Sequence, residues 1–316
     1  MSFILVVMCF SGCAGTPDAP QDEKNGLSVV TTVFPLYDWV VNVLGTEAEN
    51  TDIAMLLDSG VDLHSFQPSA DDIVKISKCD VFVYVGGESD KWVEDALKEA
   101  SNADMTVIDL MQVLGSAVKT EETVEGMQGE AESGEEETEY DEHIWLSLKN
   151  AVTAVGAISE ALSQKEPEKA DIYSANAAAF TEKLTSLDKE YETFIGGCKN
   201  KTLLFADRFP FRYLTDDYSL EYFAAFSGCS AESEADFETV RFLAAKVDEL
   251  SLSCVLTLEG SDTGIAQTVI GAAKSADVKI LSIDSMQSKT AADIENGTTY
   301  LSVMTDNLEV LKQALV

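Results

Sequence analysis

The segment LSVVTTVFPLYDWVVNVLG, residues 27–45, contains the unit that decides the fold. Residues 27–34 are β-branched and apolar, which is typical of a buried strand. Pro35 then opens an amphipathic stretch that runs to Leu44, and Gly45 is a residue that commonly ends helices. The segment therefore predicts a strand that passes directly into a helix.

The same alternation continues along the chain. Apolar runs predict further strands at residues 53–57, 81–85, 106–110, 202–206, 221–226, 254–258 and 279–283. Amphipathic patterns predict helices at residues 70–77, 92–100, 235–249, 264–276 and 294–315. Buried strands that alternate with helices form parallel sheets covered on both faces, so each half of the chain predicts an α/β lobe.

Between the two halves, residues 148–195 are helical in pattern almost throughout, with Pro167 as a division. The part from Pro167 onward would be about 40 Å long at ~1.5 Å per residue, enough to run the height of a two-lobed protein. The sequence thus predicts an N-terminal lobe over 27–165, a linking helix over 166–197 and a C-terminal lobe over 198–316.

Composition limits the class of partner. The 316 residues include 21 Lys and Arg against 56 Asp and Glu, giving a formal net charge of −35. Nucleic-acid binding needs basic side chains that neutralise phosphates, so this charge argues against it. Anionic lipid would also repel the chain, so any membrane contact is expected through an anchor alone.

The N-terminal sequence MSFILVVMCFSGCAG offers such an anchor. Its apolar run is too short to span a bilayer as a helix and is typical of the end of a secretion signal. The residues before Cys13 resemble the lipobox of bacterial lipoproteins, although the usual basic start is missing. This resemblance implies cleavage before Cys13, lipidation of its thiol and an extracytoplasmic, lipid-anchored protein, with residues 1–26 as signal and tether. The alternative is a hydrophobic N-terminal strand.

An acidic stretch interrupts the first half. Residues 119–142 contain eleven Asp and Glu, and no basic residue follows Lys119 within it. Such a composition cannot bury enough apolar surface to order itself, so we predict a mobile loop. A solvated surface insertion and a metal-gathering role both remain open.

The chain has only two histidines, His64 and His143, each in a polar turn flanked by aromatic residues. Imidazole is the commonest ligand for zinc and its neighbours, although a loop histidine is more often a plain surface residue. No H-E-x-x-H helix occurs, which argues against metalloprotease geometry, and no C-x-x-C pair indicates a zinc knuckle.

Four motifs carry a resemblance to a known family: TVFPLYD at 32–38, GVDLHSFQP at 60–68, YVGGESDKW at 84–92 and DEHIWL at 141–146. Together they make the chain similar, from Val29 onward, to the metal-specific solute-binding proteins of ABC transporters, the zinc and manganese binders. The resemblance implies two Rossmann-like α/β lobes joined by one long rigid helix, with one metal ion between them.

The resemblance also implies the metal ligands. His64 and His143 would come from the N-terminal lobe. The segment LSIDS, residues 281–285, matches the stretch that carries the terminal carboxylate ligand, which makes Asp284 the third ligand. The alternative for Asp284 is a turn or helix-cap residue that needs no metal.

The fourth position departs from the family. Counting back from Tyr213 in ADRFPFRY, residues 206–213, puts Arg208 where the family usually has His or Glu. A guanidinium has no lone pair to donate to a metal. Either Asp207 or Glu259 then joins the site, or Arg208 turns outward into an ion pair or binds an anion that travels with the metal. We expect Asp207 as the ligand and Glu259 as an outer partner that orients a ligand or Arg208.

Cys229 follows a predicted strand and is either a thiolate ligand or a structural cysteine. The function predicted is high-affinity extracytoplasmic binding of zinc, by a monomer without catalytic activity, for delivery to the permease of an ABC importer. Zinc suits imidazole and carboxylate ligands in a closed four-coordinate site. The alternatives are Mn²⁺ or Fe²⁺ binding for the same kind of importer, a secreted metallohydrolase, and an adhesin with a degenerate site.

Overall fold

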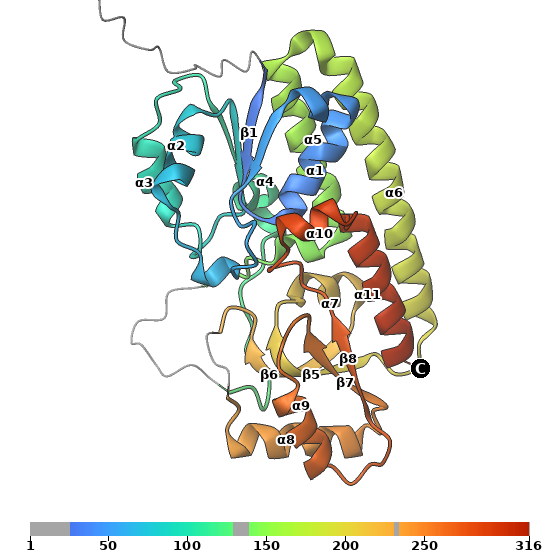
Figure 1. Cartoon of the computed structure of the whole chain (residues 1–316). Coiled ribbons are helices and arrows are strands. Elements are labelled where there is room, and N and C mark those ends of the chain that lie inside the picture. The colour runs from blue at the N-terminus through green and yellow to red at the C-terminus, as the bar shows by residue number, and fades with distance from the viewer. Residues whose placement is uncertain (1–25, 129–138, 231–233, 316) are drawn as a thin grey trace, which may run out of the picture.

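In a computed structural model, residues 26–128, 139–230 and 234–315 are described. They form two α/β lobes, one above the other in Figure 1, with a long helix along one side. Cys13 and the middle of the acidic stretch lie outside the described residues. No helix in the described part of the chain is both long and apolar enough to cross a bilayer.

The N-terminal lobe is built on a four-stranded parallel sheet of order β2-β1-β3-β4. Its strands are β1 (Ser28–Thr31), β2 (Asp52–Met55), β3 (Val81–Tyr84) and β4 (Thr106–Asp109). Its helices are α1 (Phe34–Leu44), α2 (Ala70–Lys78), α3 (Trp92–Lys98), α4 (Leu110–Leu114) and α5 (Leu148–Lys165). The opening strand and helix therefore lie where the sequence predicts them, with β1 at an interior position of the sheet.

The C-terminal lobe repeats this topology, with order β6-β5-β7-β8 and all pairs parallel. Its strands are β5 (Thr202–Phe209), β6 (Glu221–Ser227), β7 (Cys254–Leu258) and β8 (Lys279–Ile283). Its helices are α7 (Arg212–Tyr218), α8 (Phe237–Glu249), α9 (Gly264–Ala272), α10 (Ala291–Glu295) and α11 (Tyr300–Ala314). The prediction of two parallel-sheet α/β lobes is confirmed.

Helix α7 was not predicted, and two other parts of this lobe differ from the prediction. The strand expected to end at residue 206 continues to Phe209, because pairing with β6 resumes after a shift of register between Phe205 and Arg208. The helix expected over 294–315 is two helices. Gly297 lies between them at φ +88°, where a residue without Cβ is favoured, and the Thr299 side chain caps α11.

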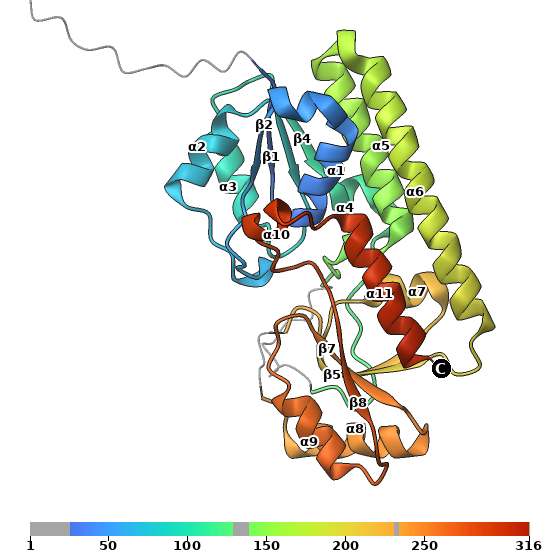
Figure 2. The same ribbon diagram turned by 45° about the vertical axis from the view of Figure 1, so that its right-hand side comes forward.

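Helix α6 (Ala170–Gly197) is the predicted long helix. Its 28 residues correspond to about 42 Å at ~1.5 Å per residue, and it runs beside both lobes in both ribbon views (Figures 1 and 2). A stripe with helical spacing is buried against them, formed by Tyr173, Ala177, Phe180, Leu184, Leu187, Tyr191 and Ile195. This stripe explains why an otherwise polar helix stays attached along its length.

The last helix gives the lobes a second connection. Helix α11 packs against both α1 and α6, so the chain returns from the C-terminal lobe to the N-terminal one. Trp39 on α1 meets Tyr300 on α11 edge to face, with ring centroids 5.3 Å apart, and the Tyr191 hydroxyl donates to the Met304 carbonyl at 2.5 Å. One apolar core consequently extends through both lobes.

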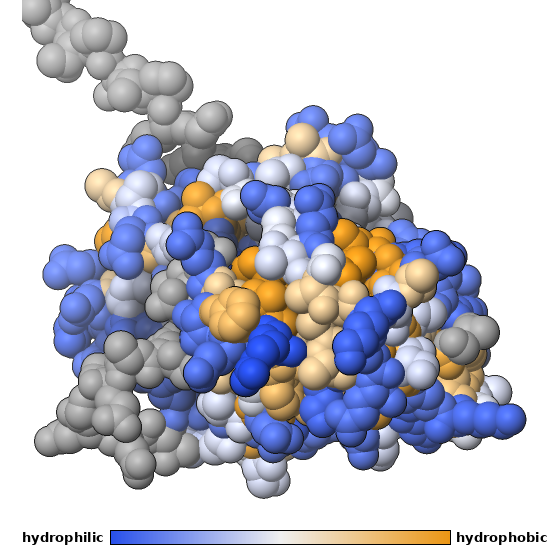
Figure 3. Space-filling model, turned by 90° about the horizontal axis from the view of Figure 1, so that it is seen from below, coloured by the Kyte–Doolittle hydropathy of each residue, from blue (hydrophilic) through white to orange (hydrophobic). Residues whose placement is uncertain are grey.

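A second, smaller core lies within the C-terminal lobe, where α8 and α9 cover one face of its sheet. Seen from below, this end of the molecule has a hydrophilic margin with apolar residues nearer its middle (Figure 3). Phe237, at the start of α8, is 79% exposed and contributes little to either core.

Trp39→Ala is expected to destabilise the protein by about 3–5 kcal/mol, because it removes a fully buried ring from the core shared by the lobes. Urea unfolding followed by circular dichroism measures this, with Phe237→Ala as an exposed aromatic control that should stay within about 0.5 kcal/mol of wild type. Equal stability of the two variants would contradict the shared core.

Candidate metal centre

The candidate centre lies where residues that follow strand ends in the two lobes meet. His64 belongs to a 3₁₀ turn, Leu63–Ser65, after β2, and Cys229 follows β6 directly. His143 lies in the loop before α5. In open parallel sheets the carboxyl ends of the strands form the ligand-binding edge, and both lobes use that edge here.

The two imidazoles point at each other. Nε2 of His64 lies 3.2 Å from Nε2 of His143, although the residues are 79 positions apart in sequence. His143 is completely buried, and the His64 side chain is 14% exposed. Tetrahedral zinc with bonds of about 2.0–2.1 Å to nitrogen places two ligand nitrogens about 3.3–3.4 Å apart, so the pair already has the spacing of zinc ligands.

Hydrogen bonds on the far side of each ring indicate which nitrogen is free. Nδ1 of His143 lies 2.9 Å from Oδ1 of Asp141, and Nδ1 of His64 lies 2.9 Å from Oγ of Ser89. The Asp141 carboxylate can only accept, so Nδ1 of His143 donates and the Nε2 of the neutral ring carries a lone pair. The Ser89 hydroxyl can accept from Nδ1 of His64, which leaves a lone pair on that Nε2 as well. In this tautomer the facing lone pairs repel each other and a cation between them removes the repulsion; in the other tautomer the Nε2–H of His64 donates to Nε2 of His143.

The two rings differ in their affinity for a proton. Burial, followed by the neighbouring His143, lowers the pKa of His64 to about 4, so His64 is neutral at physiological pH. Burial acts to lower the pKa of His143, but the carboxylates of Asp141, Glu142 and Glu121 together outweigh it and the net shift is upward. The Asp141 carboxylate thus makes His143 the more basic ring and the stronger electron donor.

Cys229 completes a group of three potential ligands. Its sulfur and one ring nitrogen of each histidine all lie within 4.8 Å of one another. A Cβ on Gly228 would come within 3.0 Å of Cε1 of His143 and 2.9 Å of the Phe209 carbonyl oxygen. Only glycine lets the Cys229 turn approach the imidazole this closely.

Carboxylates surround this group. Glu121, Glu139 and Glu142 line a cavity of about 180 Å³ together with His64 and Cys229. Glu142 is buried; one carboxylate oxygen accepts from Ser89 N at 2.7 Å, and the other makes no hydrogen bond and lies 3.6 Å from Nδ1 of His64. This concentration of negative charge favours a cation and disfavours an anion in the cavity.

Arg208 is ion-paired. Its Nη2 donates to Oδ2 of Asp62 at 2.8 Å, and the other oxygen of Asp62 accepts from the backbone N–H of His64 at 3.0 Å. Burial acts to raise the pKa of Asp62, but Arg208 and His64 together outweigh it and lower the pKa. Arg208 of the C-terminal lobe therefore holds the turn that carries His64, which is the ion-pair alternative considered for it from the sequence.

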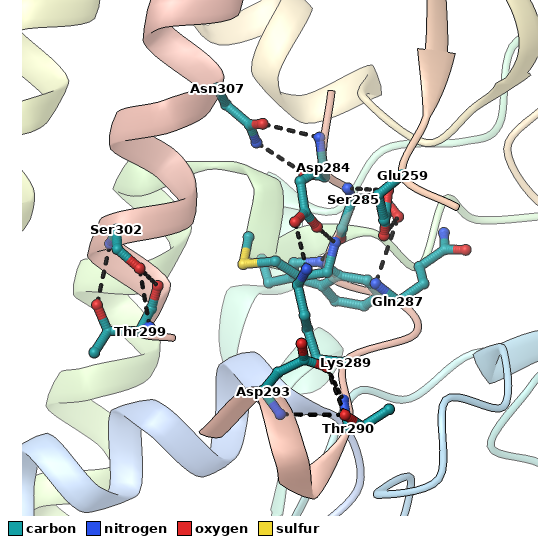
Figure 4. A network of polar contacts seen from close by, with 12 residues as sticks. Glu259, Asp284, Ser285, Gln287, Lys289, Thr290, Asp293, Thr299, Ser302 and Asn307 are labelled. Atoms are coloured by element: carbon teal, nitrogen blue, oxygen red, sulfur yellow. Dashed lines mark hydrogen bonds and ion pairs between the residues drawn. The ribbon is translucent and has the colours of Figure 1, made fainter. Parts of the chain in front are cut away.

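The two other predicted ligands, Asp207 and Asp284, are engaged elsewhere. Asp207 accepts from the backbone N–H groups of Arg208 at 2.8 Å and Leu258 at 3.0 Å. The Asp284 carboxylate accepts from the Met286 N–H at 2.8 Å and pairs with Lys289 (Figure 4). Neither belongs to the described group of His64, His143 and Cys229.

Glu259 supports the loop that carries Asp284. Its two oxygens accept from the N–H and the hydroxyl of Ser285, each at 2.8 Å (Figure 4). Burial and the nearby Asp284 raise the pKa of Glu259 to about 7. The loop is also tied to the N-terminal lobe, because Trp145 Nε1 donates to the Ser285 carbonyl at 2.8 Å.

The sequence did not indicate the outer contacts of the site. Ser89, Asp141 and Glu142 all contact the histidine rings. The position of Ser89 in the loop after β3 is the one sequence feature that could have indicated its contact with His64. The convergence of Cys229 with the histidines also depends on tertiary structure. All four cysteines in the described ranges are free: Cys79, Cys198, Cys229 and Cys254.

The ends of the acidic stretch are anchored near this centre. Thr120 and Tyr140 form an antiparallel bridge, and Asp141 N donates to the Lys119 carbonyl at 2.9 Å. Glu121 accepts from Cys229 N at 3.0 Å. The predicted loop thus begins and ends beside the ligands, while residues 129–138 lie outside the described ranges.

Comparisons with known proteins agree with this architecture. The family described as zinc-uptake complex component A, periplasmic, matches residues 29–314. The zinc-binding protein AdcA of Streptococcus pyogenes serotype M6 is 30% identical over 293 residues, which cover 90% of this chain and 55% of AdcA. The high-affinity zinc uptake system protein ZnuA of Bacillus subtilis is 25% identical over 319 residues, covering 99% of this chain and 95% of ZnuA.

A solved structure shows the same fold. The Zn(II)-bound ZnuA-like domain of Streptococcus pneumoniae AdcA superposes with a TM-score of 0.71 at 29% identity, covering 92% of this chain and 99% of that domain. This chain spans little more than half of the AdcA proteins it matches. Since the family match extends over nearly the whole sequence, the chain belongs to the family of zinc-uptake complex component A, periplasmic.

Proposed function

We propose that this protein captures zinc outside the cytoplasm and delivers it to the permease of an ABC importer. The observation that carries the proposal is the pair of Nε2 atoms 3.2 Å apart, each on a ring whose Nδ1 is engaged by a hydrogen bond on its far side. Relatives named for zinc binding and zinc uptake support the choice of metal. Mn²⁺ and Fe²⁺ are the alternative cargoes, and we assign the protein no catalytic step.

Its position at the membrane is part of the same proposal. Lipidation of Cys13 would tether a monomer to the cell membrane, and the relative from Streptococcus pneumoniae named zinc-binding lipoprotein AdcA supports this. The net charge of −35 keeps the folded part away from anionic lipid, so the tether is the only membrane contact proposed.

The proposed ligands come from both lobes, so metal binding would affect how the lobes are arranged. His64 and His143 extend from the N-terminal lobe, whereas Arg208, Cys229 and Asp284 belong to the C-terminal lobe. A metal that bonds to residues of both lobes stabilises one arrangement of the lobes. A permease that recognises that arrangement can distinguish the metal-bound protein from the metal-free protein. Asp284 remains a proposed ligand, and it would have to leave Lys289 to coordinate.

His64→Ala and His143→Ala are each expected to weaken zinc binding by at least about 100-fold, since even outer contacts of a metal site are worth about 10–100-fold. Competition titration against a zinc chelator measures the affinity. Gln313→Ala, at an exposed site on α11, should bind as wild type does. Wild-type affinity in either histidine variant would remove that residue from the site.

Asp141→Asn is expected to lower zinc affinity by about 10–100-fold, because it removes the charge that fixes the His143 ring and strengthens its donation. Asp236→Asn is the matched control, since Asn serves equally well as the N-cap of α8. The same titration compares them, and an unchanged affinity in Asp141→Asn would show that the outer carboxylate is dispensable.

Arg208→His is expected to tighten zinc binding about tenfold, or ~1.4 kcal/mol, by adding an imidazole where the family has a ligand. Arg208→Gln separates ligation from charge, since it also breaks the pair with Asp62 but donates no comparable ligand. Isothermal titration of both variants distinguishes the cases. An equal gain in both would assign the effect to charge, and no change in either would place residue 208 outside the site.

A further inference from the structure

We propose that the Cys229 thiolate is the third protein ligand of the metal, and that its sulfur makes the site select zinc-like, thiophilic cations over Mn²⁺. The inference rests on the proposed capture of a metal by His64 and His143, and it specifies which chemical class of cation they accept. It differs from the ligand set that the family resemblance implies, in which Asp284 takes this place.

The first support is position. One ligand atom each from Cys229, His64 and His143 lies within 4.8 Å of the other two. Among the His, Cys, Asp and Glu side chains of the described residues, this is the group of three that could hold a metal ion. Tetrahedral zinc with bonds of about 2.0 Å to nitrogen and 2.3 Å to sulfur needs nitrogen-to-sulfur separations of about 3.6 Å. A small inward movement of one turn therefore suffices for coordination.

The second support is the way the turn is held. The backbone N–H of Cys229 donates to Glu121 at 3.0 Å, and Gly228 packs with no Cβ against the edge of the His143 ring. These contacts fix the backbone on both sides of the sulfur. The absence of a Cβ at residue 228 brings this turn close both to the backbone after β5 and to the His143 ring.

The surroundings of the sulfur point the same way. Cys229 lines the acidic cavity together with His64. Cys79, in contrast, is fully buried in the apolar core, and its thiol donates a hydrogen bond to the Ile76 carbonyl. A structural cysteine is expected in surroundings like those of Cys79. A sulfur that faces imidazoles and carboxylates is placed for a cation.

The competing donors are less available. Arg208 has no lone pair and is paired with Asp62, and Asp284 is paired with Lys289. In coordination the Cys229 S–H bond breaks, its proton goes to solvent and the sulfur electron pair forms the bond to the metal, with no change of oxidation state. The thiolate also cancels one of the two positive charges of the ion.

The ligand type determines selectivity. Thiolate and imidazole suit zinc and related soft or borderline cations, whereas Mn²⁺ prefers oxygen ligands. A site of two imidazoles and one thiolate therefore discriminates by chemistry as well as by geometry. The Asp284 carboxylate, if it were the third ligand, would make the site more favourable to Mn²⁺.

Cobalt(II) tests the ligand directly. Titration of the full chain with Co²⁺ is expected to produce a sulfur-to-cobalt charge-transfer band in the near ultraviolet, lost in Cys229→Ser and kept in Cys198→Ser. Cys198 is the matched control because it is also partly exposed but lies at the end of α6. Cobalt binding without this band, or a band that survives Cys229→Ser, would overturn the inference and leave the proposed function intact. If the protein bound neither Co²⁺ nor Zn²⁺, the inference and the proposed function would both be overturned.

Thiol alkylation provides a second test that needs no variant. Saturating Zn²⁺ is expected to slow iodoacetamide labelling of Cys229 at least tenfold while leaving Cys198 unchanged, as read by peptide mass spectrometry. Equal labelling of Cys229 with and without bound zinc would contradict ligation by sulfur.

Selectivity gives the last test. Cys229→Asp should reduce the ratio of Zn²⁺ to Mn²⁺ affinity at least tenfold, because a carboxylate oxygen replaces sulfur. An unchanged ratio would show that residue 229 does not set the selectivity.

Discussion

The contact between the Asp141 carboxylate and Nδ1 of His143 is the interaction on which the geometry of the candidate metal centre depends. It holds the ring in one orientation, and with Ser89 on His64 it directs the two Nε2 atoms at a single point. Both rings are largely buried, so water has little access to these nitrogens, and a cation between them would bind both. The affinity of the site thus begins with hydrogen bonds that the metal never touches.

The same loop connects this centre to the scaffold. Tyr213 donates to the Asp141 carbonyl at 2.7 Å, and Tyr300 donates to the Trp145 carbonyl at 2.6 Å. Trp145 itself donates to the Ser285 carbonyl of the opposite lobe. Each of these bonds crosses from the N-terminal lobe to residues of the C-terminal half, so the loop that carries His143 is held by both. The long helix α6 sets the overall spacing, while this loop and the pair of Asp62 with Arg208 adjust the lobes at the site.

Electrostatics explains why the candidate site attracts cations but not how it would choose among them. Asp141 and the glutamates of the cavity make it attractive to any cation, so charge alone cannot separate zinc from Mn²⁺. Discrimination has to come from the donor atoms. The two imidazoles already favour the borderline metals, and a thiolate from Cys229 would add to that preference, whereas Arg208 opposes any cation that is not well coordinated.

The sequence by itself determined the fold class and half of the proposed ligand set. Alternating buried strands and amphipathic helices depend on local periodicity, so β7 and β8 were predicted with the bounds they have, and the spacing around Pro167 predicted α6. His64 and His143 were found because each lies in a recognisable local motif. Only the tertiary structure decided the rest: the pairing of Arg208 with Asp62, the engagement of Asp284 by Lys289, and the approach of Cys229 to the two rings. These depend on the β5 register shift, on Gly228 and on how two sheets far apart in sequence face each other, and no local pattern records such distances.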